Sequence, residues 1–160
     1  MAKQLVVEPE KCNGCRKCEI VCSLKHQGIS NPALSRIRVI QGAPDGFHLP
    51  MHCQHCLNPP CMAVCPRKAI SRDEELNRVL VDYDLCIACK MCVSACPFGV
   101  MQFNEARGQT FKCDLCDGDP QCVRFCETKA IDYVETVKME MDRMRAAARR
   151  WAAPTRKRAA

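Results

Sequence analysis

Apolar residues along this chain occur in short runs that are separated by polar residues, glycines and cysteines. Runs of this length that contain Val, Ile and Phe predict short extended segments. Five such segments are predicted: Leu5–Val7, Ile37–Ile40, Val79–Val81, Gly99–Phe103 and Ile131–Val134. Several stand directly before or after a group of cysteines, as in "RVLVDYDLC", "QTFKC" and "CETKAIDYV". The pattern therefore predicts a repeated order of strand, cysteine loop, short helix and strand.

The segment 27–51 lacks this regular order, because glycine and proline recur through it. They stand at Gly28, Pro32, Gly42, Pro44 and Gly46. Both residue types interrupt helices and strands, since glycine is flexible and proline has no backbone N–H. We therefore expect a connecting loop that is interrupted by one strand.

After Val134 the pattern changes to that of an amphipathic helix. The stretch "VKMEMDRMRAAARRWAAP" lacks glycine, is rich in helix-forming residues and ends at Pro154. Its apolar residues recur at steps of four, three, four and three, at Val137, Met141, Met144, Ala148 and Trp151. Residues 136–160 are therefore predicted to form a basic amphipathic helix and tail. We expect Val137, Met141, Met144 and Trp151 to dock on a partner or on a second copy of this chain, with packing on its own body as the alternative.

The composition shows that an apolar core cannot hold this chain together alone. Sixteen of the 160 residues are cysteine, whereas only eight are Phe, Tyr or Trp. A small chain with so few large apolar side chains needs cross-links. Disulfides, zinc ions and iron–sulfur clusters would each account for so many cysteines.

The location of the protein bears on that choice. The N-terminus "MAKQLVVEPEK" has no apolar stretch long enough for the core of a signal peptide, and no run of about 18 apolar residues occurs. We expect a cytoplasmic protein without a membrane span; export together with a partner that carries the signal is the alternative. Thiols stay reduced in the cytoplasm, which argues against disulfides.

The net charge of +6 does not indicate nucleic-acid binding. Residues 142–160 carry seven Lys or Arg and one acidic residue, so the whole excess lies there and the rest of the chain is neutral. Iron–sulfur clusters with thiolate ligands would add negative charge and outweigh the excess. Binding to a phosphate backbone is therefore not expected.

The cysteines form four groups of four. These are Cys12, Cys15, Cys18 and Cys22; Cys53, Cys56, Cys61 and Cys65; Cys86, Cys89, Cys92 and Cys96; and Cys113, Cys116, Cys122 and Cys126. Every group reads C-x2-C, then a third cysteine after two to five residues, then C-x3-C, and no cysteine is left over. Such regularity indicates an internal repeat.

These spacings suit iron–sulfur clusters better than zinc. Four soft thiolates suit either, but zinc usually takes two ligands from each of two knuckles, so a third cysteine in the same loop is unnecessary. In the bacterial run C-x2-C-x2-C-x3-C-P, three cysteines hold one cluster and the fourth ligates the other. Pro66 and Pro97 follow the fourth cysteines of groups two and three. His52 and His55 adjoin Cys53 and Cys56, and we expect them to be surface groups or to hydrogen-bond sulfur rather than to be ligands.

The motifs "CQHCLNPPCMAVCP" and "CIACKMCVSACPFGV" resemble those of the four-cluster ferredoxin-like electron-transfer subunits of multisubunit redox enzymes, and "FKCDLCDGDPQCVRFCETKAI" is similar to the last group of that family. The resemblance covers roughly residues 3–135. It implies an α+β fold of two pseudo-symmetric bacterial ferredoxin-like modules, stapled by clusters and followed by the C-terminal helix. The outer module would comprise residues 1–26 and 104–135 and the inner module residues 52–103, with 27–51 connecting them.

The resemblance also implies four [4Fe–4S] clusters and the ligands of each. The implied sets are Cys12, Cys15, Cys18 and Cys126; Cys22, Cys113, Cys116 and Cys122; Cys53, Cys56, Cys61 and Cys96; and Cys65, Cys86, Cys89 and Cys92. The sequence departs from the bacterial run at Ser23 and Glu127, where proline would follow the fourth cysteine. These departures weaken the geometric expectation for the outer module.

The implied function is electron transfer without catalysis, and no nucleophile–base pair, phosphate-binding loop or nucleotide fingerprint was found. The chain looks most similar to the small subunits of tungsten-dependent aldehyde oxidoreductases and related benzoyl-CoA reductase complexes. A catalytic subunit with a tungsten- or molybdenum-pterin cofactor would then be one partner, and a flavin subunit that reduces NAD could be the other. A ferredoxin-like subunit of a hydrogenase, carbon monoxide dehydrogenase or formate dehydrogenase is the alternative. An iron–sulfur sensor or interaction protein is an alternative of another class.

Overall fold

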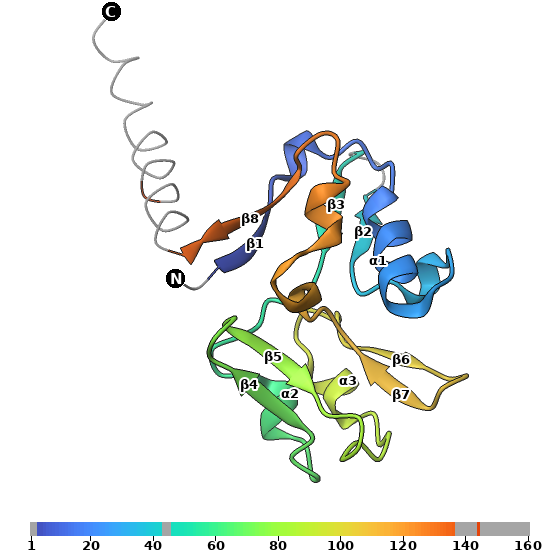
Figure 1. The fold of residues 1–160 in the computed structure, drawn as a ribbon, viewed down its shortest axis with the longest axis vertical. Coiled ribbons are helices and arrows are strands. Elements are labelled where there is room, and N and C mark those ends of the chain that lie inside the picture. Colours follow the sequence, from blue (N-terminus) through green and yellow to red (C-terminus); the bar gives the residue numbers. More distant parts are fainter. Residues whose placement is uncertain (1–2, 43–45, 137–143, 145–160) are drawn as a thin grey trace, which may run out of the picture.

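The structure, a computed structural model, describes residues 3–42, 46–136 and 144. Within these residues the strands form separate antiparallel sheets of two strands each (Figure 1). The pairs are β1 (Lys3–Val7) with β8 (Ile131–Glu135), β2 (Arg38–Gln41) with β3 (His48–Met51), β4 (Ile70–Asp73) with β5 (Arg78–Val81), and β6 (Gln102–Asn104) with β7 (Gln109–Phe111). The first pair joins the two ends of the described chain, with Leu5 opposite Tyr133.

Each cysteine group contributes one α-helix, and shorter 3-10 turns stand between them. The helices are α1 (Lys17–Gln27), α2 (Pro60–Ala63), α3 (Met91–Ala95) and α4 (Gln121–Arg124), and the turns are η1 (Pro9–Lys11), η2 (Pro32–Leu34) and η3 (Leu115–Gly118). Three of the helices end just before the fourth cysteine of their group, whereas α1 continues past Cys22. It ends at Gly28, which has a φ of 72° and donates its N–H to Leu24 O. The missing proline at position 23 therefore permits a longer helix.

The connecting segment differs from the expectation of a loop with one strand. It contains two strands, β2 and β3, which pair with Val39 opposite Pro50. Gly42 permits the turn between them, since a Cβ there would lie 2.0 Å from the ring of Phe47. The strand β3 was not predicted, because "HLPM" contains proline, which disfavours a strand. Proline is nevertheless tolerated in an edge strand such as β3.

Two further differences concern strand position. The extended segment expected from Gly99 begins only at Gln102, because Gly99 has a φ of 63° and closes a turn on Cys96 O. The strand β4 was not among the predicted segments, since "ISRD" has a single apolar residue. It forms because its pairing with β5 places Ile70 opposite Val81.

Packing joins the groups in pairs. Helix α1 packs on α4, and α2 packs on α3. In Figure 1, β1, β8 and α1 lie in the upper half of the molecule, whereas β4 to β7, α2 and α3 lie in the lower half. The buried core contains few large side chains, such as Leu5, Ile37 and Ile131, and many cysteines. Cysteine thus occupies positions that aliphatic side chains would fill in an ordinary domain.

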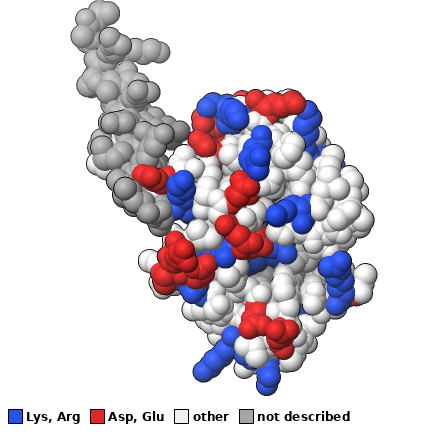
Figure 2. Space-filling view, in the orientation of Figure 1, with Lys and Arg blue, Asp and Glu red and all other residues white. Residues whose placement is uncertain are grey.

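The surface carries charges of both signs. Figure 2 shows Lys and Arg interspersed with Asp and Glu on the face in view, among broad uncharged areas. Among the described helices, none has the length and the apolar character that a membrane crossing requires. The expected boundary of the modules at residues 103 and 104 falls inside β6, so the β6–β7 hairpin belongs to both sides of that boundary.

Candidate iron–sulfur centres

Four cavities in the structure are each lined by four cysteines. Cavity A is lined by Cys12, Cys15, Cys18 and Cys126; cavity B by Cys22, Cys113, Cys116 and Cys122; cavity C by Cys53, Cys56, Cys61 and Cys96; and cavity D by Cys65, Cys86, Cys89 and Cys92. Their empty volumes, counted with the solvent at their openings, lie between about 310 and 360 Å³. Every cysteine is free of disulfide bonds. These are the four sets that the family resemblance implies.

In each cavity, three cysteines come from one loop that is turned by residues with positive φ. Gly14 and Arg16 turn the first loop, with φ of 73° and 59°, and Ala88 and Lys90 turn the third, with φ of 58° and 62°. Residues other than glycine adopt this conformation only where the surroundings hold them, and such residues gather at functional sites. The loops therefore curl tightly enough to bring three thiols to one cavity.

The fourth cysteine of each group reaches the neighbouring cavity, and in groups one, two and four its sulfur accepts a backbone hydrogen bond. Cys65 Sγ accepts from Ala69 N at 3.3 Å, and Cys126 Sγ accepts from Ala130 N at 3.2 Å, each four residues ahead. The turn after Cys126 therefore needs no proline at position 127. Cys22 Sγ lies inside α1 and accepts instead from Arg36 N at 3.3 Å.

The cavities follow one another in a row from A to D. Cavities A and B are joined by the C-x3-C steps of groups one and four, and C and D by those of groups two and three. B and C meet in the middle, where Lys112 lines C and the next residue, Cys113, lines B. His52 and Cys53 repeat this arrangement, since His52 lines B and Cys53 lines C.

The end cavities A and D each have one exposed cysteine, whereas the middle cavities B and C have none. Cys15 in A and Cys89 in D are exposed, whereas Cys53 and Cys113 in the middle are buried. A threonine hydroxyl lies beside one sulfur at each end. Thr128 Oγ1 lies 3.7 Å from Cys126 Sγ in A, and Thr110 Oγ1 lies 3.8 Å from Cys86 Sγ in D.

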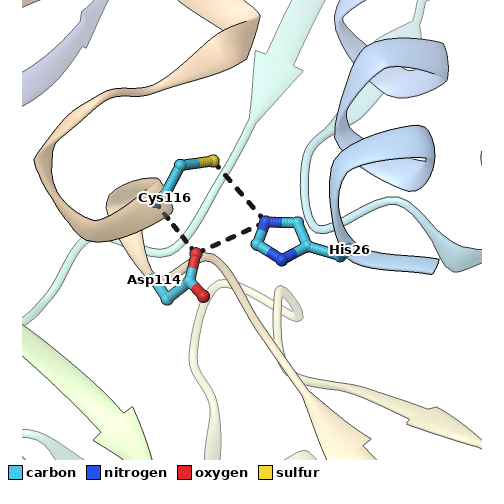
Figure 3. Close-up of side chains that lie close together, drawn as sticks. All are labelled: His26, Asp114 and Cys116. Atoms are coloured by element: carbon cyan, nitrogen blue, oxygen red, sulfur yellow. Dashed lines mark hydrogen bonds and ion pairs between the residues drawn. The ribbon is translucent and has the colours of Figure 1, made fainter. Parts of the chain in front are cut away.

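Charged groups gather at cavity B. His26 Nε2 lies 3.5 Å from Cys116 Sγ and 3.5 Å from an oxygen of Asp114, as Figure 3 shows. Asp114 also accepts the backbone N–H of Cys116 at 3.0 Å and pairs with Arg36. Burial alone would raise the pKa of Asp114, but the charge of Arg36 and the hydrogen bond from the Cys116 N–H hold it below its usual value. Asp114 is therefore ionised and fixes both basic groups beside the cavity.

His26, Asp114 and Cys116 could by their spacing hold a metal ion, because their ligand atoms lie within 4.8 Å of one another. Cys116, however, lines cavity B with three other thiols. Burial lowers the pKa of His26, so its ring is neutral and can donate one N–H. We interpret this cluster as hydrogen bonding around a thiol of cavity B rather than as a separate site.

These groups were not among the predicted site residues, although the sequence carries weak signals for them. His26 stands four residues after Cys22, which is the spacing that places two residues on one helix face. Lys112 and Asp114 flank Cys113 directly. Charged residues beside cysteines are common on surfaces, so only the packing shows that these are enclosed.

The two histidines of group two have other partners. His52 Nδ1 donates to Cys53 O at 2.9 Å, and His55 Nδ1 accepts from Val79 N at 3.0 Å. Burial lowers the pKa of His55 to about 3, so this ring is neutral. These contacts fix the histidines against the backbone of the loop and of β5.

The thiols fit an iron–sulfur group by their chemistry. Burial raises the pKa of Cys18 to about 12 and that of Cys61 to about 11, so these isolated thiols hold their protons at neutral pH. A bound metal removes such protons, because coordination stabilises the thiolate. Four soft donors, three of them from one loop, match the ligand requirement of a [4Fe–4S] cluster.

Most of the predicted docking residues lie outside the part that the structure describes. This applies to Val137, Met141 and Trp151. Met144 is described; it is helical and 66% exposed.

The fold and the four cysteine-lined cavities define a ferredoxin-like iron–sulfur protein. The family model described as a 4Fe-4S dicluster domain matches residues 44–136, and a second, described as a 4Fe-4S binding domain, matches residues 9–25. The chain belongs to the 4Fe-4S ferredoxin-like family of electron-transfer subunits.

Relatives with curated names agree with this family. The chain is 42% identical over 133 residues to the polyferredoxin-like subunit of aliphatic sulfonate oxidoreductase from Pyrococcus furiosus, which covers 83% of this chain and 76% of that one. It is 34% identical over 165 residues to the electron transport protein HydN of Escherichia coli K12, with 88% and 92% covered. Because such relatives are named as electron-transport proteins or iron–sulfur subunits, the chain is a non-catalytic member of oxidoreductase systems.

Among solved structures, the chain resembles a chain of the active site complex BamBC of benzoyl coenzyme A reductase, solved with 1,5-dienoyl-CoA. The TM-score is 0.50 at 26% identity, with 83% of this chain and 75% of that chain covered. The likeness thus extends over most of both chains.

Proposed function

We propose that this protein holds four [4Fe–4S] clusters, one in each of cavities A to D, and relays electrons along the row. The observation that carries the proposal is the convergence of all sixteen cysteines in sets of four, with three thiols of each set from one loop. A bound cluster of this kind takes up and releases one electron. The chain's own residues hold the clusters, order them and set their surroundings.

The two-module organisation is part of this proposal. Residues 1–26 and 104–135 form the outer module around A and B, and residues 52–103 form the inner module around C and D. The pairing of α1 with α4 and of α2 with α3 supports the division. The matching hydrogen bonds at Cys65 and Cys126 support a pseudo-symmetric relation.

The two ends of the row serve as the points of electron entry and exit. Exposed Cys15 in A and exposed Cys89 in D bring both end cavities to the surface. A partner can therefore approach either end at an exposed cysteine, whereas B and C have no exposed cysteine. This arrangement suits a subunit that stands between two redox partners.

One partner is a catalytic subunit with a tungsten- or molybdenum-pterin cofactor, and the other is an acceptor such as a flavin subunit that reduces NAD. We favour a tungsten aldehyde oxidoreductase, following the family likeness. The name of the Pyrococcus relative supports a second substrate class, the aliphatic sulfonates. The sixteen free thiols support a reducing, cytoplasmic location.

Metal analysis of the tagged complex, purified without oxygen, tests the proposal. We expect about sixteen iron atoms per copy of the chain, four for each of four clusters, together with tungsten. Molybdenum would favour formate or sulfoxide chemistry, and nickel a hydrogenase or carbon monoxide dehydrogenase. Zinc in place of iron would overturn the proposal. Loss of clusters on reduction, instead of reversible reduction with all clusters retained, would favour a sensor.

We also propose that residues 137–160 form a helix that docks on a partner or on a second copy of the chain and thereby increases the size of the assembly. The exposure of Met144 supports this. A chain truncated after Thr136 should form a smaller assembly in light scattering, with unchanged iron content. An unchanged assembly size would show that the segment packs on its own body.

A further inference from the structure

Lys112 is a buried lysine at the centre of the row. Only 4% of it is exposed, and it directly follows β7. Its side chain lines cavity C together with the four cysteines of that cavity. The ammonium donates to the carbonyl oxygen of Val79 and, at 3.0 Å, to that of Cys113. The two carbonyls therefore hold the charged end of Lys112 in one place.

This cation has no acidic partner among the residues that the structure describes. No carboxylate oxygen of those residues lies within the 4.0 Å of an ion pair from Lys112 Nζ. Other enclosed cations do have such partners: Arg36 pairs with Asp114, and Arg78 pairs with Asp73 and Asp117. A buried charge without a counter-charge is costly. The position of Lys112 therefore favours negative charge in cavity C.

We propose that Lys112 is the internal counter-cation of the cluster in cavity C and raises the reduction potential of that cluster. The inference rests on the proposed function, since it needs a thiolate-ligated cluster in C. Such a cluster is an anion, and one electron from a neighbouring cluster or an external low-potential reductant adds one negative charge. The fixed ammonium of Lys112 stabilises this added charge, and no bond forms or breaks. Charge and hydrogen bonding near the sulfurs are known levers on cluster potential.

The enclosed cation beside cavity B differs from Lys112, because it has an acidic partner. This cation, Arg36, already faces the carboxylate of Asp114, so the pair brings no net charge. The side chain of Lys112 does not line B. Its field also reaches the thiols of C, because it lowers the pKa of Cys53 and Cys61 against the effect of burial. The effect of Lys112 should therefore be largest on one cluster of the four.

Three variants of the intact chain, loaded with clusters and purified without oxygen, test this. Lys112→Met removes the charge and keeps an unbranched chain, Lys112→Gln keeps one hydrogen-bond donor group, and Lys112→Arg keeps the charge. The readout is an anaerobic redox titration followed by electron paramagnetic resonance, with iron content measured on the same samples. Lys11→Met is the matched control, because Lys11 also directly precedes the first cysteine of its group but is exposed and paired with Glu8.

We expect Lys112→Met and Lys112→Gln to shift the reduction equilibrium of one cluster about tenfold toward the oxidised form, which is about 59 mV for one electron. Lys112→Arg and Lys11→Met should each shift it less than about threefold. The Cys56→Ser variant, which changes a ligand of C, identifies the signal that should move. Unchanged potentials in Lys112→Met with full iron content would overturn the inference.

Two further results are informative. Loss of iron in the Met and Gln variants but not in Lys112→Arg would support the inference, because the cluster then requires the cation to assemble. Loss of iron in Lys112→Arg as well would overturn it, since shape rather than charge would matter. If the unmodified protein contains no iron, the proposed function fails instead, and the two failures are thereby distinguished.

Discussion

The end cavities and the middle cavities of the row are built from the same cysteine motif but lie in different surroundings. At the ends, Cys15 and Cys89 are exposed, and neutral hydroxyls stand beside the sulfurs. In the middle, no cysteine is exposed, and the charged side chains that line the cavities include the buried Lys112. Charged side chains that line the ends, such as Lys17 and Lys90, are exposed. The same cysteine spacing thus lines cavities in two different environments.

Different surroundings control the electrostatics of the end cavities and of the middle cavities. Water and a docked partner screen or replace the surroundings of A and D, so the properties of the ends depend on what binds there. Beside B and C, the side chains of Lys112 and of the Arg36–Asp114 pair are largely enclosed, so their charges act with less screening than exposed charges do. Substitutions should therefore change the free energy of unfolding and the reduction potentials more at the middle cavities than at the ends.

The largest contrast is expected from removing one ligand. Cys113→Ala removes a buried thiol of B that also belongs to the core. Loss of the metal centre there should destabilise the protein by about 4 kcal/mol or more. Cys15→Ala at the exposed end should cost less than half of that, because the core keeps its other members. Anaerobic denaturant unfolding, with iron content in parallel, measures both; equal losses would abolish the distinction between middle and end.

The next contrast concerns ion pairs. Asp114→Ala leaves Arg36 enclosed without its partner and removes the acceptor of the Cys116 N–H, so we expect a loss of about 3 kcal/mol in the free energy of unfolding. Glu127→Gln breaks the exposed pair with Lys17 beside cavity A and should leave the free energy of unfolding almost unchanged, because water screens that pair. The same unfolding experiment compares them. A similar cost for both would show that Arg36 finds water when Asp114 is removed.

A smaller effect is expected at the sulfur of Cys116. His26→Leu removes the imidazole that lies 3.5 Å from this sulfur. Since a hydrogen bond to sulfur favours the more negative, reduced form, its loss should shift one cluster severalfold toward the oxidised form. His26→Gln, which can still donate, should restore part of the shift in a redox titration. An unchanged reduction potential in His26→Leu would mean that this contact has no electronic role.

The smallest effects are expected from the hydroxyls at the ends. Thr110→Val and Thr128→Val remove contacts of 3.8 and 3.7 Å to Cys86 and Cys126. Contacts of this kind are weak, so we expect changes below about 1 kcal/mol in stability and below about threefold in the reduction equilibrium. The same titration checks this. A shift as large as that of Lys112→Met would show that the end cavities are as well shielded as the middle ones.

Much of the local structure could be predicted from the sequence. The segments that became β1, β2, β5 and β8 were found from their apolar runs, because β-branched residues in short runs carry a clear signal. The strands β3 and β4 were missed, since their pairing partners rather than their own residues hold them extended. The continuation of α1 past Cys22 was also missed, although Ser23 in place of proline permits it.

The sequence by itself determined the chemistry of this protein, because the spacing of three cysteines in one loop fixes how close their thiols can come. It also determined the family, through the repetition of that spacing in four groups. Only the tertiary structure decided which cavities are enclosed and which charged groups face them. Solvent exposure and electric field depend on contacts between segments far apart in the chain, such as β5 and Lys112. No local sequence pattern predicts such contacts.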